Sequence, residues 1–389
     1  MATFRVSGEA DVMEVVRAAR ESKRTLEIIG HGTKRGFGRP VECDDILDLS
    51  GLSGIVKYEP DEMIITARAG TPVAEIEATL AERNQRLGFE PPDWSSLLYA
   101  YYKPASMGGV LSADANGSAA IRYGRCRDHL LGFRAVNGFG EAYKGGAKVV
   151  KNVTGFDLPK LFCGAMGTLG PLTEVTLRVF PKPPVCVVFE ITELTFPQAA
   201  PLLNRVWTSA LGPTCLAYMP AVVARELPGL AENAILIRIE GSPTHLKEQG
   251  TLLRALMDGR SIGENEDGVA IIAALGNGMP FHCNSLGVWR LTIAPSRAAD
   301  LIDELEPPIW FADWAGGLLW IGLKNKPPLH EVATRHRAHA VQIRPEGHAA
   351  ASEVPFAPEH RVRAELTRRV KAAFDPLRLF NPGRMWEGV

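Results

Sequence analysis

The chain has 389 residues, a hydrophobic fraction of 46%, a charged fraction of 22% and a formal net charge of −1. That length allows two domains with cores of their own, and the near-neutral charge argues against nucleic acid or an anionic membrane as partner. The sequence has neither an apolar signal core at its N-terminus nor a run approaching the ~20 apolar residues of a membrane helix. The six cysteines are scattered, which predicts that the protein resides in a reducing cytosol. They include no Cys-x-x-Cys pair, so we expect no metal or iron–sulfur site built by this chain alone.

The first informative element is a predicted strand, residues 26–29, that runs directly into a glycine-rich loop. The loop reads Gly30-His-Gly-Thr-Lys-Arg-Gly-Phe-Gly38 and contains neither a G-x-G-x-x-G nor a P-loop pattern. Its backbone N–H groups, Thr33 and Lys34 are suitable donors for a pyrophosphate. An ordinary solvated turn is the alternative interpretation.

Two helices are expected to flank this region. Ser7 is the predicted cap of a helix over residues 9–22, and Thr71 the predicted cap of a helix that begins at Pro72. Between them the pattern predicts strands over residues 46–49, 55–58 and 63–67.

A second glycine-bearing segment runs from Pro104 to Ser118. It predicts a tight turn up to Gly109, a short helix over residues 109–115 and a second turn at Asn116-Gly117, since both residue types tolerate the left-handed conformation.

A third stretch, residues 145–178, combines a basic approach, a short apolar helix over 157–162 and glycines at positions 164, 167 and 170. Glycine allows a backbone to approach a ligand closely, and exposed N–H groups in such turns bind anions. A tight turn in a β-rich core is the alternative. Residues 175–179 then alternate with period two, which predicts a half-buried strand.

A proline cluster at residues 181–184 marks a predicted domain boundary, because prolines stiffen a chain and do not fit the interior of a sheet. Beyond it, strands and helices alternate, which favours an α+β cap domain of the ferredoxin-like type with Trp310, Trp314 and Trp320 in its core. The predicted strands are residues 185–191, 215–218, 234–240, 288–294, 318–323 and 341–344, and the predicted helices are residues 197–210, 243–258, 296–305 and 329–338. An amphipathic helix over residues 362–373 follows. The predicted domains are residues 1–180, 181–345 and 346–389.

These segments, in this order, resemble the vanillyl-alcohol-oxidase or PCMH type of FAD-binding flavoprotein. The run Lys-Asn-Val-Thr-Gly-Phe-Asp-Leu at 151–158 and the tail Phe-Asn-Pro-Gly-Arg-Met at 380–385 are most similar to the FAD-binding E subunits of bacterial glycolate oxidases. The resemblance covers nearly the whole chain. It implies an α+β fold: a flavin domain of two subdomains, a cap, and a C-terminal segment that returns to the flavin domain.

The resemblance also implies the residues that contact FAD. The expected cofactor-binding residues are Gly30, His31, Gly32, Thr33, Lys34, Pro104, Ser106, Met107, Gly108, Gly109, Asn116, Gly117, Ser118, Gly155, Gly164, Gly167, Thr168, Gly170, Leu172 and Asn381. Some members of the superfamily bind FAD covalently through a histidine of the first loop. That position is Thr33 here, so the expected FAD is non-covalent, and His31 is a less suitable link.

Three departures from the family pattern bear on function. Met166 replaces an acidic residue, and Pro171, which has no backbone N–H, replaces a branched one. The His-x-Gly-Asp-Gly-Asn type of stretch carried by catalytic relatives is absent. The remaining candidates for a base and for cations that hold a carboxylate are His348, Arg344 and Arg384.

The resemblance therefore implies an FAD subunit of a heteromeric glycolate oxidase that passes electrons onward to partners. Those partners are a D-type FAD subunit and an iron–sulfur F subunit, in the cytoplasm or at the periphery of the inner membrane through these subunits. The alternatives are a free-standing FAD-dependent 2-hydroxy-acid dehydrogenase of the D-lactate type and a flavin-bearing assembly subunit without turnover.

Overall fold

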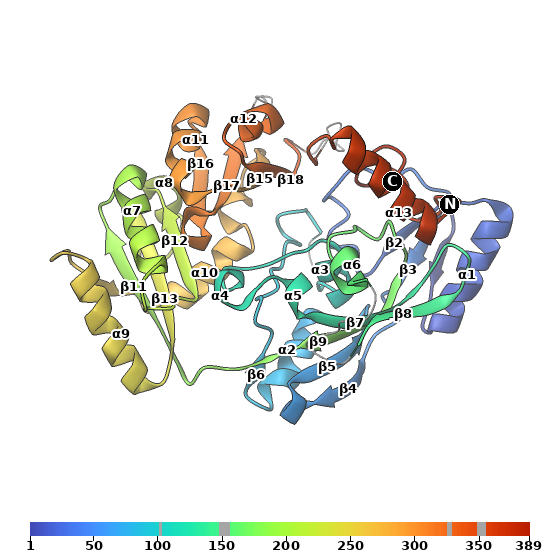
Figure 1. Cartoon of the computed structure of the whole chain (residues 1–389), viewed down its shortest axis with the longest axis horizontal. Helices are drawn as coiled ribbons and strands as arrows, with labels where there is room; N and C mark the ends of the chain where they lie inside the picture. Colours follow the sequence, from blue (N-terminus) through green and yellow to red (C-terminus); the bar gives the residue numbers. More distant parts are fainter. Residues whose placement is uncertain (101–102, 148–155, 325–328, 348–354) are drawn as a thin grey trace. The chain divides into compact units, whose positions relative to one another are not determined.

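The structure, a computed structural model, describes residues 1–100, 103–147, 156–324, 329–347 and 355–389 (Figure 1). They form two compact units. The first comprises Met1–Asn116, Gly124–Lys182 and Ala350–Val389, and the second comprises Gly117–Tyr123 and Pro183–Ala349. The first unit is thus assembled from three separate stretches of the chain, one of them C-terminal.

Three sheets form the framework of the first unit. Their strands are β1 (Thr3–Arg5), β2 (Leu26–Ile29), β3 (Asp45–Asp48), β4 (Ile55–Glu59), β5 (Ile64–Arg68), β6 (Gln85–Arg86), β7 (Leu130–Val136), β8 (Ala142–Gly146), β9 (Leu172–Arg178) and β10 (Phe180–Pro181). β1 and β2 pair in parallel with the central β3. A five-stranded antiparallel sheet has the order β4-β5-β9-β7-β8, and β6 pairs with β10.

The helices of the first unit are α1 (Glu9–Ser22), α2 (Val73–Ala81), α3 (Met107–Ser112), α5 (Cys126–His129), α6 (Leu158–Phe162) and α13 (Arg361–Phe374). Both predicted N-caps are wrong. Gly8 is the N-cap of α1, where the Asp11 carboxylate accepts from the amides of Ser7 and Gly8, each at 3.0 Å. Pro72 is the N-cap of α2. The Thr71 hydroxyl does not cap this helix but donates to the carbonyl of Arg68, the last residue of β5.

A compact apolar cluster joins α1, β2 and β3 to the end of the chain. Leu379 and Phe380 are buried in it beside Leu26. The Leu26 amide donates to the Leu379 carbonyl at 2.7 Å, and the Asn381 amide donates to the Leu26 carbonyl at 2.9 Å. The C-terminal tail therefore runs parallel to β2 and ends beside the loop that follows this strand.

The second unit is built on one antiparallel sheet of order β14-β11-β13-β12-β16-β17-β15-β18. Its strands are β11 (Val185–Thr192), β12 (Cys215–Met219), β13 (Ala234–Gly241), β14 (Gly263–Glu264), β15 (Gly287–Thr292), β16 (Ile309–Asp313), β17 (Leu318–Leu323) and β18 (His339–Arg344). Its helices are α4 (Ala120–Tyr123), α7 (Phe196–Trp207), α8 (Ala221–Ala224), α9 (Pro243–Leu256), α10 (Gly268–Gly276), α11 (Ala298–Leu305) and α12 (Leu329–Arg335).

Apolar side chains of this sheet form a large core with α7, α9, α11 and α12. Trp310 and Trp320 are buried as predicted, whereas Trp314 is half-buried. The α+β class is confirmed. Among the described residues, no helix is both long enough and apolar enough to span a lipid bilayer.

Candidate functional site

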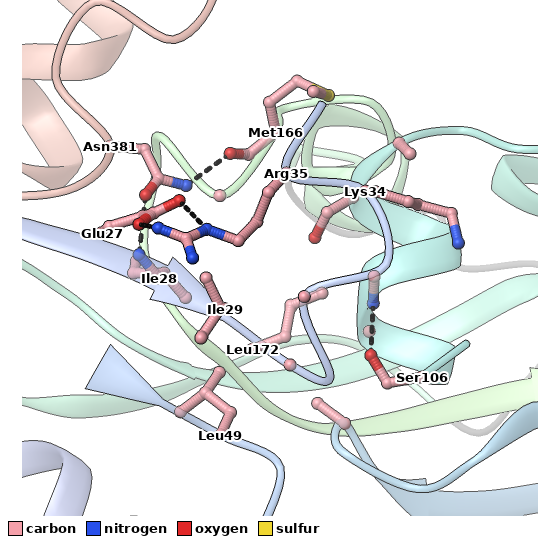
Figure 2. Close-up of a pocket in the computed structure, with 18 of the residues that line it drawn as sticks. Glu27, Ile28, Ile29, Lys34, Arg35, Leu49, Ser106, Met166, Leu172 and Asn381 are labelled. Carbon is pink, nitrogen blue, oxygen red and sulfur yellow. Dashed lines mark hydrogen bonds and ion pairs between the residues drawn. The ribbon is translucent and has the colours of Figure 1, made fainter. Parts of the chain in front are cut away.

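A pocket opens in the first unit where three segments far apart in the sequence converge (Figure 2). They are the loop Gly30–Gly38 after β2 (the first loop), the start of α3 and the loop Gly164–Gly170 before β9 (the glycine loop). The pocket has about 760 Å³ of empty space, part of it open to solvent, within the size range of small-molecule sites. Its lining residues are Glu27, Ile28, Ile29, Gly30, Gly32, Thr33, Lys34, Arg35, Leu49, Ala69, Ser106, Gly108, Gly109, Ser112, Ala113, Met166, Gly167, Gly170, Leu172, Asn381 and Arg384.

The first loop offers backbone donors to this pocket. Its internal hydrogen bonds run from the amide of Arg35 to the carbonyl of Gly32 (3.4 Å) and from the amide of Phe37 to the carbonyl of Lys34 (3.0 Å). The amides of Gly32, Thr33 and Lys34 donate to no carbonyl of the described residues. Successive N–H groups of this kind suit an anion such as a pyrophosphate.

The Lys34 ammonium is the clearest sign of an anionic ligand. Lys34 is only 9% exposed, and its Nζ has no hydrogen-bond partner among the described residues. Burial lowers its pKa to about 8, although the nearby Asp93 charge opposes this shift. A buried ammonium without a partner is costly, and a phosphate oxygen beside it would satisfy it. The residues present therefore fit the pyrophosphate of FAD.

Glycines allow the first loop and α3 to approach each other. A β-carbon at Gly30 would lie 2.3 Å from Ser106 Oγ, and one at Gly108 would lie 2.8 Å from the Ala69 carbonyl oxygen. Ser106 is the N-cap of α3, and its Oγ accepts from the Gly109 amide at 3.3 Å (Figure 2). Larger residues at these two glycine positions would push the pocket walls apart.

Asn381, from the C-terminal tail, ties two walls of the pocket together. Its Oδ1 accepts from the Ile28 amide and its Nδ2 donates to the Met166 carbonyl, both at 2.7 Å (Figure 2). Gly167 has φ +74°, and a β-carbon there would lie 2.6 Å from Asn381 Nδ2. The Asn381 amide is thus used by backbone groups, and it positions the pocket walls.

Lys371 is a second link between the C-terminal segment and the glycine loop. This residue of α13 is 1% exposed, and its Nζ donates to the carbonyls of Thr168 (2.6 Å) and Phe380 (2.8 Å). The Asp375 carboxylate lies 2.9 Å from the same Nζ. Burial lowers the Lys371 pKa, and Asp375 opposes the shift. This buried ion pair fixes the position of the glycine loop.

Arg384 and the Glu27–Arg35 ion pair complete the pocket wall. The Arg384 Nη2 donates to the carbonyls of Lys34 and Arg35, each at 2.9 Å. Burial lowers the Arg384 pKa to about 10, although Glu27 favours its charged form. Glu27 accepts two hydrogen bonds from the Arg35 guanidinium (Figure 2). Arg384 therefore braces the first loop.

The pocket brings together most of the predicted cofactor residues. Those in its lining are Gly30, Gly32, Thr33, Lys34, Ser106, Gly108, Gly109, Gly167, Gly170, Leu172 and Asn381. Others lie in the first unit outside the lining: His31, Pro104, Met107, Asn116, Gly164 and Thr168. Gly117 and Ser118 belong to the second unit, and Gly155 lies outside the described residues.

The polar side chains outside the lining have partners within the protein. His31 Nε2 lies 3.0 Å from the Gly70 carbonyl oxygen, which can only accept, so the ring donates to it. The Asn116 Oδ1 accepts from the Cys126 amide at 2.6 Å. The Thr168 hydroxyl donates within its own turn. These three side chains stabilise the loops that carry the pocket.

The predicted catalytic residues do not gather at one site. Arg344 lies in the second unit, is 1% exposed and donates to the carbonyls of Phe281, Asn284 and Leu286 at 2.8–2.9 Å. Arg384 lies in the pocket wall of the first unit. His348 lies outside the described residues. Both arginines thus donate to backbone carbonyls, and their catalytic role stays a prediction.

Sequence reasoning missed several lining residues, namely Glu27, Ile28, Ile29, Arg35, Leu49, Ala69, Ser112, Ala113 and Met166. Glu27 gave a usable signal. A carboxylate inside the apolar strand Leu26–Ile29 needs a cationic partner when it is buried, and Arg35 in the adjoining loop is such a cation.

Comparison with known proteins identifies the family. A family model described as an FAD binding domain matches residues 2–146. The glycolate oxidase subunit GlcE of Escherichia coli (strain K12) is 31% identical over 376 residues, covering 96% of this chain and 96% of that protein. The glycolate oxidase subunit GlcD of Bacillus subtilis (strain 168) is 26% identical over 59% of this chain and 49% of that protein.

The solved structure of p-cresol methylhydroxylase with substrate bound shares the fold. It superimposes with a TM-score of 0.74 and 16% identity, over 98% of this chain and 88% of that one. The pocket geometry, the FAD-binding family model and the 31% identity to GlcE over nearly the whole chain agree. The chain therefore belongs to the family of glycolate oxidase subunit GlcE, FAD-binding oxidoreductases with a PCMH-type fold.

Proposed function

We propose that this chain is the FAD-carrying subunit of a heteromeric glycolate oxidase, in which glycolate becomes glyoxylate and the electrons leave through partner subunits. The single observation that carries the proposal is the pocket around Lys34, whose buried ammonium has no partner among the described residues and, with the backbone donors, suits a pyrophosphate. The similarity to GlcE over 96% of both chains supports the choice of glycolate.

The residues of the pocket have distinct roles in this proposal. Lys34 and the amides of the first loop bind the pyrophosphate. Asn381 joins Ile28 to the glycine loop, and Lys371 fixes the glycine loop through the Thr168 carbonyl. FAD, when bound, supplies a two-electron acceptor for the oxidation of a hydroxyl-bearing carbon. The protein contributes binding and orientation.

The proposed FAD is non-covalent. The resemblance to related flavoproteins implies that Thr33 stands where their covalent histidine does, and the His31 ring donates to the Gly70 carbonyl and is not part of the pocket lining. Acid precipitation of the purified chain should therefore release all flavin into the supernatant. Flavin that stays in the pellet would contradict this.

Substrate oxidation is proposed to need the assembled complex. A 2-hydroxy acid requires a base for its hydroxyl and cations for its carboxylate, held within about 3 Å of the reacting groups. This chain lacks the Gly-Asp-Gly stretch, and Arg344 and Arg384 donate to backbone carbonyls. A D-type FAD subunit and an iron–sulfur F subunit, in the cytoplasm or at the inner membrane, are the proposed partners.

The deciding experiment is dye reduction with glycolate and with D-lactate. The FAD-loaded chain alone is compared with the chain coexpressed with D-type and F-type subunits from the same organism. Turnover by the complex and little by the chain alone supports the proposal. Robust turnover by the chain alone, abolished by His348→Ala, would establish a free-standing dehydrogenase instead.

A further inference from the structure

The C-terminal helix α13 has an unusual distribution of exposure. It has the sequence Arg-Val-Arg-Ala-Glu-Leu-Thr-Arg-Arg-Val-Lys-Ala-Ala-Phe, and Lys371 is its one buried residue. Val362 is 72% exposed and Leu366 is 58% exposed. Lys371 is buried while two apolar residues, Val362 and Leu366, face outward, which is the opposite of the usual arrangement for these residue types on a surface helix.

The apolar stripe points away from the first unit. Val362 and Lys371 are nine residues apart, about two and a half turns at 3.6 residues per turn, so they lie on opposite sides of the helix. Leu366 and Ala373 follow Val362 at four and eleven residues, on the same outward side, and Ala373 is also exposed.

The helix is poorly supported by the described residues. Its C-terminal end is held by Lys371 and by Phe374, whose ring lies 5.5 Å from that of Phe162 and 5.9 Å from that of Tyr143. Its first two turns have exposed or half-buried residues throughout. Isolated helices of this length are marginal in water, and packing of an apolar face normally stabilises them. An unpartnered stripe on such a helix points to a binding surface.

The charge around the stripe indicates the chemistry of its occupant. Arg361, Arg363, Arg368 and Arg369 are all exposed, and Glu365 is the one acidic residue of the helix. Arg369 follows Val362 by seven residues and therefore lies on the stripe between Leu366 and Ala373, whereas the other three arginines lie beside the stripe. The whole chain, by contrast, has a formal net charge of −1. An occupant that contacts this stripe must therefore bring carboxylates to its arginine rim.

We propose that α13 is a docking helix, and that its outward stripe fits an apolar groove, rimmed by aspartate and glutamate, on a partner protein. The inference rests on the proposed function, since it takes this partner to be a subunit of the oxidase complex. A membrane is a poorer match. The outward face carries a valine, a leucine and an alanine with Arg369 among them, without the aromatic residues and large apolar face of helices that lie in a lipid interface.

The test uses the full chain coexpressed with the D-type and F-type subunits and measures complex formation by size-exclusion chromatography and titration. The variant Val362→Glu/Leu366→Glu places two charges on the stripe. The matched control, Val222→Glu/Val269→Glu, changes two valines that are each 49% exposed on helices of the second unit. We expect the stripe variant to bind at least tenfold more weakly and the control to bind as the wild type does.

A charge-reversal variant, Arg363→Glu/Arg369→Glu, tests the acidic rim. Its affinity should also fall at least tenfold, and the wild-type affinity should weaken as salt is raised. Both α13 variants should keep the flavin content and melting temperature of the wild-type chain, because the changed side chains are exposed. Equal binding by the wild type and the stripe variant overturns the docking role of α13 while leaving the proposed function intact.

Other outcomes identify a different occupant and also overturn the inference. A dimer of the chain alone that the stripe variant dissociates would assign the surface to a second copy. Stripe-dependent binding to phosphatidylserine vesicles would assign it to a membrane. A stripe variant with a lowered melting temperature would show that the chain's own segment covers the helix. A wild-type chain that associates with neither subunit rejects the proposed function as well.

Discussion

Lys34 is the residue whose chemistry is most directly tied to the cofactor. The Lys34→Met variant should bind FAD about 10- to 100-fold more weakly, because a hydrogen bond to a charged group contributes ~1.5–3 kcal/mol. The cofactor-free variant should melt no lower than the wild type, since a buried ammonium without a partner is removed. Flavin fluorescence titration and thermal melts measure both effects. Lys57→Met, at an exposed lysine paired with Glu59, is the matched control and should change neither quantity.

The same lysine predicts a pH dependence of FAD binding. Its pKa in the cofactor-free chain is about 8, against an ordinary value of 10.5. An anion beside Lys34 raises this pKa, so FAD affinity is complete below pH 8 and falls as the pH rises through 8. The Lys34→Met variant should lack this fall. Wild-type affinity that stays constant through pH 8 would place the pyrophosphate elsewhere.

Lys34 affects folding with the opposite sign. Between pH 8 and 10.5 the unfolded chain binds more protons at Lys34 than the folded chain does. Its contribution to the stability of the cofactor-free chain is therefore unfavourable below pH 8 and improves as the pH rises through this window. FAD affinity and cofactor-free stability should thus change in opposite directions above pH 8, and Lys34→Met should remove both trends.

Two pocket glycines should respond differently to alanine. Gly167 has φ +74°, and a β-carbon there would meet Asn381 Nδ2, so Gly167→Ala should destabilise the chain by at least about 1–2 kcal/mol and weaken FAD retention. A β-carbon at Gly109 meets Ser106 Oγ alone, at 3.1 Å. Gly109→Ala should stay within about 0.5 kcal/mol of the wild type, as alanine favours a helix. Denaturant melts and flavin content give the comparison, and equal loss in both variants would contradict it.

At the scale of residues, the sequence predicted those parts of the pocket that can be recognised from neighbouring residues in the chain. Gly30 and Lys34 lie four residues apart in one glycine-rich loop, and Ser106 lies in a second glycine-bearing segment, so each can be recognised as a turn former or a donor from its own neighbours. Glu27 and Arg35 were missed because their pairing depends on a strand being buried. Arg384 is predicted to hold the substrate carboxylate, and this role stays a prediction; nothing in the sequence indicates that its guanidinium also donates to the carbonyls of the first loop. A contact that spans 350 residues leaves no local pattern in the sequence.

At the scale of elements, Lys371 joins α13 to the glycine loop through its hydrogen bond to the Thr168 carbonyl. Lys371→Met should destabilise the chain by about 3–5 kcal/mol, because removal of one partner leaves Asp375 buried and uncompensated. FAD retention should fall as well, since the Thr168 carbonyl loses its anchor. Lys160→Met removes an exposed lysine paired with Asp157 on α6 and serves as control. Similar melting temperatures for the two variants would show that the buried pair is not needed.

Hydrophobic periodicity predicted the long elements well, but it predicted poorly the elements that are flanked by proline or glycine. The strand β13 and the helix α1 follow plain alternating or helical patterns and lie within a residue of their predicted bounds. The strand β16 directly follows two prolines, and the helix α10 begins and ends with glycine. Both were missed because proline and glycine normally signal a break. The apolar stripe of α13 was predicted, but which side of the helix faces the unit depends on Lys371.

For the whole molecule, the first unit depends on both ends of the chain. Deletion of residues 375–389 removes Leu379 and Phe380 from the core and Asn381 from the pocket. The shortened chain should copurify without flavin and should lose the cooperative melt of the first unit. Absorbance at flavin wavelengths and calorimetry, against the full chain prepared in parallel, are the measurements. A shortened chain with full flavin occupancy would show that the tail is dispensable.

The C-terminal position of these pocket residues has a consequence for biosynthesis. While Asn381 and Arg384 remain within the ribosomal exit tunnel, the first loop and the glycine loop have already emerged but lack the tail that joins them. A nascent chain therefore presents no finished pocket until these two residues have left the tunnel. Capture of FAD should therefore follow the synthesis of this segment, and chains truncated before Asn381 should hold little flavin.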